Sequence, residues 1–314
     1  MIGRMSDLFS DRLLAAIAAK GSPICVGIDP IYESLPDAVA GPPNKRDANN
    51  ADAAIDAIFD FTIGVLRLVA PHVPIVKFQS AYFEKYLSEG VEAYYSLIQE
   101  AKHLGLLVIG DVKRGDIGST ASAYAAAHLA DPPFTTIEDT VAPDAITVSP
   151  MLGLDTLEPF VHTVKTDAKG LFVLVRTSNP GSAAFQDVAL ADGRTWSEML
   201  ADALAPVAAG DGLVGVGGYS SIGAVVGATQ PHTMLSLRRR LPQSIFLLPG
   251  YGTQGATAEM TRAAFTDGRG AIVSASRSIL YAHKDKAYAG LGDWKQCVEK
   301  AVLAMKADLA PVLR

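Results

Sequence analysis

The residues best suited to chemistry in this chain of 314 residues lie between Gly110 and Thr120, in the sequence GDVKRGDIGST. The segment follows a short apolar run and precedes an alanine-rich stretch, which places Asp111 and Lys113 at the carboxyl end of a predicted strand. The two-residue period of a strand would direct both side chains the same way. An isolated pair of this kind is usually a surface ion pair, with Asp116 or Ser119 capping the next helix. Because unpaired charge at the end of a buried strand is costly, we favour a functional role.

A second charge, Lys77, lies at the end of the short apolar run that begins at Pro74. A lysine in such a place more often extends its ammonium group to solvent than takes part in catalysis. If both strands belong to one barrel, however, Lys77 joins the charges of the Asp111–Asp116 segment at its mouth. Two cations that alternate with two carboxylates would keep one another ionised.

Two segments further along the chain are typical of phosphate binding. Pro249–Gly255 (PGYGTQG) and Ser274–Ser278 (SASRS) follow the last two apolar runs expected to form strands. Loops at these two places commonly bind phosphate in (β/α)8 barrels, because glycines let backbone N–H groups approach the anion. Arg277 would add a forked, permanently charged donor.

Two turns at other strand ends offer further polar contacts. Asp29, in the sequence GIDP, could accept hydrogen bonds from sugar hydroxyls, although a structural turn aspartate fits the pattern equally well. The sequence RTSNPG, from Arg176 to Gly181, offers hydroxyl and backbone groups that could recognise a planar heterocycle. As an isolated turn it would usually be structural.

Short apolar runs recur along the chain, and each could form a strand that positions one of these groups. The predicted strands are Ile24–Ile28, Pro74–Phe78, Leu106–Asp111, Ala145–Val148, Leu171–Val175, Ile222–Gly227, Ile245–Leu248 and Ala271–Ser274. They lack the strict alternation of half-exposed strands, so we expect both faces of each to be buried. The sixth strand is ambiguous, because Gly212–Gly217 competes with Ile222–Gly227.

Helical periodicity separates these runs, for example over Asp52–Val69, Val91–Leu104 and Trp196–Ala209. The alternation predicts an α/β fold with a single (β/α)8 TIM barrel rather than an open doubly wound sheet. We expect one domain over residues 1–314, with an amphipathic N-terminal helix at about 6–20, the barrel at about 24–283 and a C-terminal helix at about 294–309. The stretches Gly41–Asn50 and Asp131–Pro143 are predicted loop insertions, and no sequence remains for a fused second enzyme.

Composition narrows the class of protein. A formal net charge of −6 disfavours general binding to nucleic acids or anionic membranes, and no run approaches the roughly 18 apolar residues of a membrane span. The charged N-terminal residues fit a helix better than a signal peptide. Two cysteines, Cys25 and Cys297, are too few for a disulfide framework or a four-cysteine zinc site, and we expect reduced thiols in a cytoplasmic protein. The six histidines show no metal-binding spacing.

The chain resembles the orotidine 5′-phosphate decarboxylases, in particular their longer bacterial subgroup, from about Ile24 to Ile279. The resemblance rests on Lys77, on the DxKxxDIGxT string that begins at Asp111, on the PGxGxQG string that begins at Pro249, and on Arg277. It implies a homodimeric (β/α)8 barrel that uses no metal or organic cofactor. The implied reaction converts orotidine 5′-monophosphate to uridine 5′-monophosphate and carbon dioxide, the last step of de novo pyrimidine synthesis.

The resemblance also implies roles for the charged residues. Lys113 would be the acid that protonates C6 of the pyrimidine, and Asp111 would face the substrate carboxylate. Lys77 would complete the charged array and contact the ribose. Asp116 and Thr120 would reach across the dimer interface into the active site of the partner subunit.

The remaining expected site residues bind the rest of the nucleotide. By the same resemblance, Asp29 would bind the ribose and Ser178 the pyrimidine, while Gln254 and Arg277 would bind the phosphate. Ser276 belongs to the same phosphate loop, at a position where the family usually has glycine. A loop that closes over the substrate is expected somewhere within residues 180–219.

Two other interpretations remain open. A sugar-phosphate decarboxylase, such as the 3-keto-gulonate 6-phosphate enzyme, has a similar DxKxxD string, but its enediolate chemistry needs Mg²⁺, which prefers oxygen ligands. Such relatives supply an acidic residue where this chain has Lys77, and a cation there would repel the metal. The other interpretation is an inactive phosphate-binding barrel, which would have no use for two carboxylates beside an anion.

Overall fold

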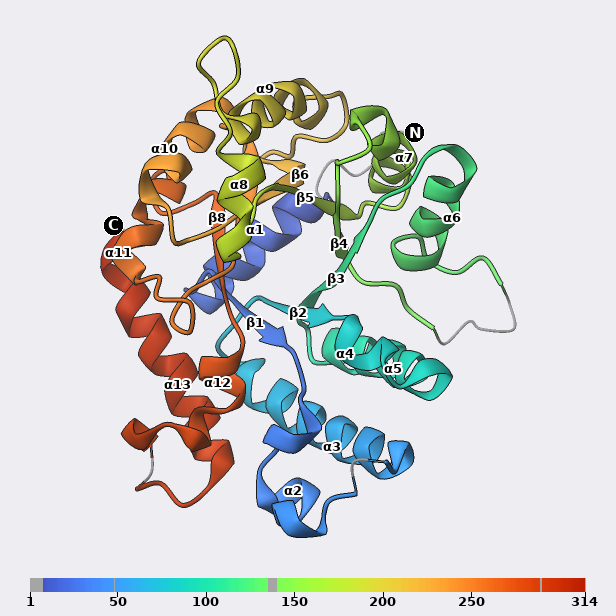
Figure 1. The fold of residues 1–314 in the computed structure, drawn as a ribbon, viewed down its shortest axis with the longest axis vertical. Helices are drawn as coiled ribbons and strands as arrows, with labels where there is room; N and C mark the ends of the chain where they lie inside the picture. Colours follow the sequence, from blue (N-terminus) through green and yellow to red (C-terminus); the bar gives the residue numbers. More distant parts are fainter. Residues whose placement is uncertain (1–7, 48, 135–139, 289, 314) are drawn as a thin grey trace.

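The computed structural model describes residues 8–47, 49–134, 140–288 and 290–313. Within these ranges, eight parallel strands follow one another around a closed barrel, and β8 pairs with β1 (Figure 1). The strands are β1 Ile24–Ile28, β2 Ile75–Gln79, β3 Leu107–Arg114, β4 Ala145–Val148, β5 Gly170–Arg176, β6 Ser220–Val226, β7 Ser244–Leu248 and β8 Ala271–Ala275. The predicted TIM barrel is confirmed, and the strand ends differ from the predicted ones by three residues or fewer.

Helices connect the strands and surround the barrel (Figure 1). They are α1 Phe9–Lys20, α2 Asp37–Ala40, α3 Ala51–Val69, α4 Ala81–Glu84, α5 Leu87–His103, α6 Gly118–His128, α7 Glu158–Thr166, α8 Ala183–Gln186, α9 Trp196–Ala208, α10 Pro231–Arg240, α11 Ala258–Thr261, α12 Arg277–Leu280 and α13 Trp294–Leu309. Local sequence signals set several helix starts. Asn50 caps α3 through Ala53 N–H, and Thr195 forms a capping box with Glu198 at the start of α9.

The amino-terminal end of the barrel is closed by α1. Phe9 packs edge-on against Phe172 of β5, with ring centroids 6.0 Å apart, and Ser10 N–H donates to Ser221 Oγ of β6. Gly170 gives Phe9 its space, since a methyl group there would lie 2.2 Å from the ring. Because α1 fills this end, the carboxyl ends of the strands form the open mouth of the barrel.

The ambiguity over the sixth strand is resolved in favour of β6, Ser220–Val226. The competing stretch Gly212–Gly217 is a turn with one isolated bridge, and Gly212 has a positive φ of 76°. The turn docks on α1, because the N–H groups of Val216 and Gly217 donate to the carboxylate of Asp11. The backbone of this stretch therefore serves a contact with α1 rather than a strand.

Other predictions concern the ends and insertions of the chain. Residues 6 and 7 of the expected N-terminal helix, and residues 135–139 of the second insertion, lie outside the described residues. The first insertion contains a short 3-10 turn, Pro43–Lys45, and precedes α3. Both cysteines are buried free thiols. Among the described helices, none has the length and apolar character needed to cross a membrane.

Candidate active site

Asp111, on β3 at the barrel mouth, lies at the centre of a buried charge cluster. Its Oδ2 accepts from Lys77 Nζ at 2.6 Å and from Gln79 Nε2 at 2.9 Å. Its Oδ1 accepts from Lys113 Nζ at 2.6 Å and from Thr147 Oγ1 at 2.8 Å. Lys113 belongs to β3 itself, and the neighbouring strands supply the other donors, since Gln79 of β2 lies directly beside Asp111 in the sheet register. Both carboxylate oxygens are thus fully hydrogen-bonded, as a buried charge requires.

The cluster keeps its central groups ionised. Burial by itself would raise the pKa of Asp111, but the ammonium groups of Lys77 and Lys113 outweigh it and hold that pKa well below its usual range. Burial would likewise lower the pKa of Lys77, yet Asp111 and, more weakly, Asp29 raise it above its ordinary value. Asp111 thus lies between two ammonium groups, and Asp29 adds a second carboxylate near Lys77.

An irregularity in β3 brings Lys113 to Asp111. Lys113 has a left-handed backbone, with φ at 47°, and the register between β3 and β4 shifts between Gly110 and Arg114. A left-handed conformation costs roughly 1–2 kcal/mol for a side chain of this kind, and the hydrogen bond from Lys113 N–H to Thr147 Oγ1, 3.0 Å long, helps to hold it. The predicted proximity of Asp111 and Lys113 is therefore correct, but regular strand alternation was the wrong reason for it.

Two adjoining cavities open beside the charge cluster. The larger has a volume of about 480 Å³, and its lining includes Lys77, Asp111, Lys113 and Ser178. The smaller has a volume of about 110 Å³, and its lining includes Arg277. Asp29, Lys77, Pro249 and Gln254 line both. An elongated ligand with an anionic end would fit this arrangement, with its anion beside Arg277 and its other end beside Lys113.

Ser178 lies on a loop that a buried arginine holds in place. Arg176, at the end of β5, forms a two-pronged ion pair with Asp187 at 2.7 and 2.8 Å and donates to the carbonyl oxygen of Thr177. Gly227 lets the loop approach β6, because a methyl group there would lie 3.0 Å from Cα of Ser178. These contacts direct the loop toward the larger cavity.

The smaller cavity gathers four of the predicted nucleotide-binding residues, Asp29, Gln254, Ser276 and Arg277. Asp29 Oδ1 and Ser276 Oγ are buried and have no hydrogen-bond partner among the described residues. Buried polar atoms are nearly always hydrogen-bonded, so these two are suited to contacts with a ligand. Gly27 gives Ser276 its space, since a methyl group at Gly27 would lie 2.8 Å from Ser276 Cβ.

Asp116 and Thr120 lie away from these cavities. As the described residues outline them, neither cavity of the chain includes Asp116 or Thr120. Asp116 is half-buried, and its Oδ1 accepts from the N–H of Ile117, whereas Thr120 is exposed on α6. The alternative in which Asp116 or Ser119 caps α6 is not supported, because Ile117 is the N-cap residue and no side chain caps it.

Sequence reasoning did not select Gln79 and Thr147, which both donate to Asp111. Thr147 is a polar residue in a strand that is otherwise apolar, and Gln79 ends a strand whose one other polar residue is Lys77; this was the only local signal. Their importance depends on which strands are neighbours, so it became visible only in the closed barrel.

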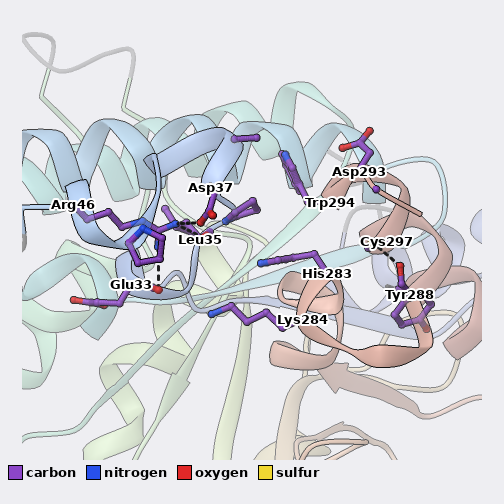
Figure 2. A pocket seen from close by; sticks show the side chains of 14 residues that line it. Glu33, Leu35, Asp37, Arg46, His283, Lys284, Tyr288, Asp293, Trp294 and Cys297 are labelled. Carbon is purple, nitrogen blue, oxygen red and sulfur yellow. Dashed lines mark hydrogen bonds and ion pairs between the residues drawn. The ribbon is translucent and has the colours of Figure 1, made fainter. Parts of the chain in front are cut away.

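A further cavity, with a volume of about 530 Å³, lies elsewhere, between the β1–α3 loop and the segment that joins α12 to α13 (Figure 2). Its lining mixes basic side chains, such as His283 and Lys284, with acidic ones, such as Asp37 and Asp293. Arg46 uses all its donors on this loop, where it bonds the carbonyl oxygens of residues 32, 33, 35 and 41 and the carboxylate of Asp37. The arginine therefore holds the loop together rather than offering donors to a ligand.

Comparison with known proteins agrees with this geometry. The sequence model of the orotidine 5′-phosphate decarboxylase / HUMPS family matches residues 22–290. An orotidine 5′-phosphate decarboxylase of Rhodopirellula baltica is 40% identical over 308 residues, which cover 96% of this chain and 98% of the relative. That of Clostridium novyi is 36% identical over 302 residues, with the same coverage of 96% and 98%.

A solved structure leads to the same assignment. A Streptomyces avermitilis crystal structure, provisionally assigned as an orotidine 5′-phosphate decarboxylase, aligns with a TM-score of 0.78 at 32% identity and covers 100% of this chain and 98% of that one. Since the family match spans most of the sequence and the charged strand ends meet in one site, the protein belongs to the orotidine 5′-phosphate decarboxylase / HUMPS family.

Proposed function

We propose that this protein decarboxylates orotidine 5′-monophosphate to uridine 5′-monophosphate and carbon dioxide, the last step of de novo pyrimidine synthesis. The observation that carries the proposal is the Lys113–Asp111–Lys77 cluster at the junction of two cavities, one of which contains Arg277. The relatives at 40% and 36% identity bear the name of this enzyme.

The chemical difficulty lies at C6 of the pyrimidine. Loss of carbon dioxide leaves a carbanion there with no conjugated group to accept the charge, so the barrier is mainly electrostatic. In our proposal the Lys113 ammonium group stabilises the developing negative charge and then donates a proton to C6. A fixed donor of this kind contributes about 3–4 kcal/mol in comparable sites.

Asp111 acts on the bound substrate, whereas Lys113 acts on the carbanion. With both oxygens hydrogen-bonded and its pKa held low, it stays anionic when the substrate carboxylate enters beside it. The resulting repulsion raises the free energy of the bound substrate and is relieved as carbon dioxide leaves. Lys77 keeps Asp111 charged and contacts the ribose.

The rest of the nucleotide supplies binding energy. In the proposal Asp29 binds the ribose, Ser178 the pyrimidine, and Gln254, Ser276 and Arg277 the phosphate. Contacts far from C6 can be used to hold the reacting groups in position, so the phosphate contributes to rate as well as affinity.

The loop that closes over the substrate would lie in residues 180–195. The later part of the segment 180–219 contains α9, Trp196–Ala208, which packs on the barrel through buried Leu200 and Leu204. The earlier part carries Phe185, which is 73% exposed and lies close along the chain to Ser178. Movement of this part toward the cavity would bury the phenylalanine and exclude water.

We further propose a cytoplasmic homodimer of single-domain chains with shared active sites, in which Asp116 and Thr120 of each chain enter the site of the partner subunit. Ile117, Met151 and Leu152 are 63%, 69% and 58% exposed, and they support this interface. They lie in adjoining loops, since Ser149 N–H donates to the carbonyl oxygen of Arg114. An apolar group of this size beside Asp116 is typical of a surface that a second subunit covers.

Absorbance of the pyrimidine during incubation with orotidine 5′-monophosphate and EDTA tests the reaction. Complete turnover without added metal supports the proposal, which invokes no metal or organic cofactor. Binding without turnover would favour an inactive barrel. Mg²⁺-dependent turnover of a keto-sugar phosphate instead would favour the sugar-phosphate enzymes of the same family.

A further inference from the structure

Tyr281 holds the short segment that follows β1 through one hydroxyl group. Its hydroxyl donates to the carbonyl oxygen of Asp29 at 2.9 Å and accepts from the N–H of Ile31 at 2.7 Å. These two groups flank Pro30, directly after β1. The bonds hold the short segment that carries the Asp29 carboxylate into the cavities.

The tyrosine is itself firmly held. Its side chain is buried, and its ring stacks on Phe61 of α3 with an interplanar angle of 2° and centroids 6.3 Å apart. Burial is the main cause that raises the pKa of the phenol, so the hydroxyl stays protonated at neutral pH and can donate. The ring is therefore a fixed support for a hydrogen bond.

The same residue also belongs to the phosphate side of the site. Tyr281 directly follows α12, whose first residue is Arg277, and its N–H donates to the carbonyl oxygen of Arg277 at 3.0 Å. Arg277 and Asp29 both line the smaller cavity. Tyr281 thus connects the backbone of Asp29, which is expected to bind the ribose, with the backbone of Arg277, which is expected to bind the phosphate.

The outer part of the same loop is held independently. Arg46 bonds the carbonyl oxygens of Tyr32, Glu33 and Leu35, and Figure 2 shows it beside Glu33 and Leu35. Loss of the Tyr281 hydroxyl would consequently free only the Asp29–Ile31 segment and leave the rest of the loop in place.

We propose that Tyr281 is a positioning residue, which sets the direction of the Asp29 carboxylate toward the ribose hydroxyls and its separation from Arg277. This inference rests on the proposed function. Asp29 Oδ1 has no hydrogen-bond partner among the described residues, so its direction depends on the backbone that Tyr281 holds.

The test compares Tyr281→Phe with the wild type in calorimetric binding of uridine 5′-monophosphate and of its 2′,3′-dideoxy analogue. Tyr281→Phe should weaken binding of the ribonucleotide roughly tenfold, as expected for loss of a buried hydrogen bond, and that of the dideoxy analogue less than twofold. The matched control is Tyr95→Phe, which removes a hydroxyl that donates to the Ala127 carbonyl at 2.9 Å, away from the site. It should change neither affinity.

A double-mutant cycle tests whether Tyr281 affects ribonucleotide binding through Asp29. If Tyr281 acts through Asp29, then Tyr281→Phe should weaken ribonucleotide binding much less in an Asp29→Ala background than in the wild type. Equal losses for both nucleotides, or fully additive losses in the cycle, would overturn the inference. Failure of the proposed function is a separate result, because the wild type would then neither bind the ribonucleotide nor turn over orotidine 5′-monophosphate.

Discussion

At the scale of single residues, the behaviour of Asp111 depends on its four donors. A carboxylate that is 6% exposed would be costly to bury alone. Four donors, from Lys77, Gln79, Lys113 and Thr147, offset that cost, and Asp111 in turn holds both ammonium groups. Lys113 differs from Lys77 in that nearly half of its side chain is exposed toward the mouth. This exposure lets the Lys113 ammonium group extend into the larger cavity.

Replacement of Lys113 separates chemistry from binding. Lys113→Ala should lower kcat by at least a thousandfold, because the proton donor and the charge beside C6 are both lost. Binding of uridine 5′-monophosphate, measured by calorimetry, should persist, since Arg277 and the phosphate loops remain. Lys165→Ala removes an exposed lysine from α7 and is the control of equal charge. Turnover near the wild-type rate in Lys113→Ala would refute the assignment of the acid.

The depressed pKa of Asp111 predicts how stability varies in acid. The pKa of an aspartate carboxyl group is about 3.9 in the unfolded chain, and that of Asp111 is lower in the folded protein. Above about pH 3.9 this difference stabilises the folded state. The stabilisation is lost as the pH falls from there toward the pKa of the folded state. Urea unfolding between pH 7 and pH 3 should therefore show a steeper loss of unfolding free energy below about pH 4 in the wild type than in Asp111→Asn. Parallel curves would mean that Asp111 does not titrate below its usual range.

At the scale of elements, the ends of β1 and β8 must approach closely for the phosphate loop to form. Gly27 of β1 pairs with Lys77 of β2 in the register and faces Ser276 directly after β8. Its φ is not positive, so the reason for glycine here is space rather than conformation. The position of Arg277 therefore depends on the absence of a side chain on the neighbouring strand.

Gly27→Ala should push Ser276 and Arg277 away from β1. The crowded methyl group should cost about 1–3 kcal/mol of unfolding free energy and weaken binding of uridine 5′-monophosphate more than that of uridine. Gly27→Ala combined with Ser276→Gly removes the atom that the methyl group meets, and it should restore the unfolding free energy. Gly290→Ala, at an exposed glycine with no atom near the added methyl group, is the control. Absence of recovery in the double variant would contradict this account of the packing.

At the scale of the whole molecule, one chain does not bring all the expected catalytic residues together. Lys77, Asp111 and Lys113 line one cavity, whereas Asp116 lies outside it on the segment that leads into α6 and Thr120 lies outside it on α6. A two-fold dimer would supply each site with the pair from the opposite chain, because such an interface applies the same contacts in both directions.

Mixing two inactive variants tests the shared site. If Lys113→Ala and Asp116→Ala exchange subunits, one pocket of each mixed dimer receives native Lys113 from one chain and native Asp116 from the other. Activity in the orotidine 5′-monophosphate assay should then return to roughly a quarter of the wild-type value for statistical pairing. If both residues served the site of their own chain, every pocket would carry one defect and mixing would recover nothing.

The sequence by itself determined the strand pattern, the barrel class and the charged residues at the strand ends. Strands buried on both faces appear as uninterrupted apolar runs, and a charge at the end of such a run is conspicuous whatever the rest of the fold. Asp29, Lys77, Asp111, Lys113 and Arg277 were therefore candidates from local context, and the family resemblance supplied their expected roles. The sixth strand was the exception, because Gly212–Gly217 has a similar local composition but turns back on α1.

Only the tertiary structure decided which of these groups meet and what holds them. The donors Gln79 and Thr147 come from the strands on either side of β3, and Tyr281 bonds Asp29 across 252 positions of the chain. The left-handed backbone of Lys113 likewise depends on Thr147 of the next strand. Contacts between such distant residues leave no periodic signal, because they depend on barrel closure and strand register rather than on the conformational preferences of neighbouring residues.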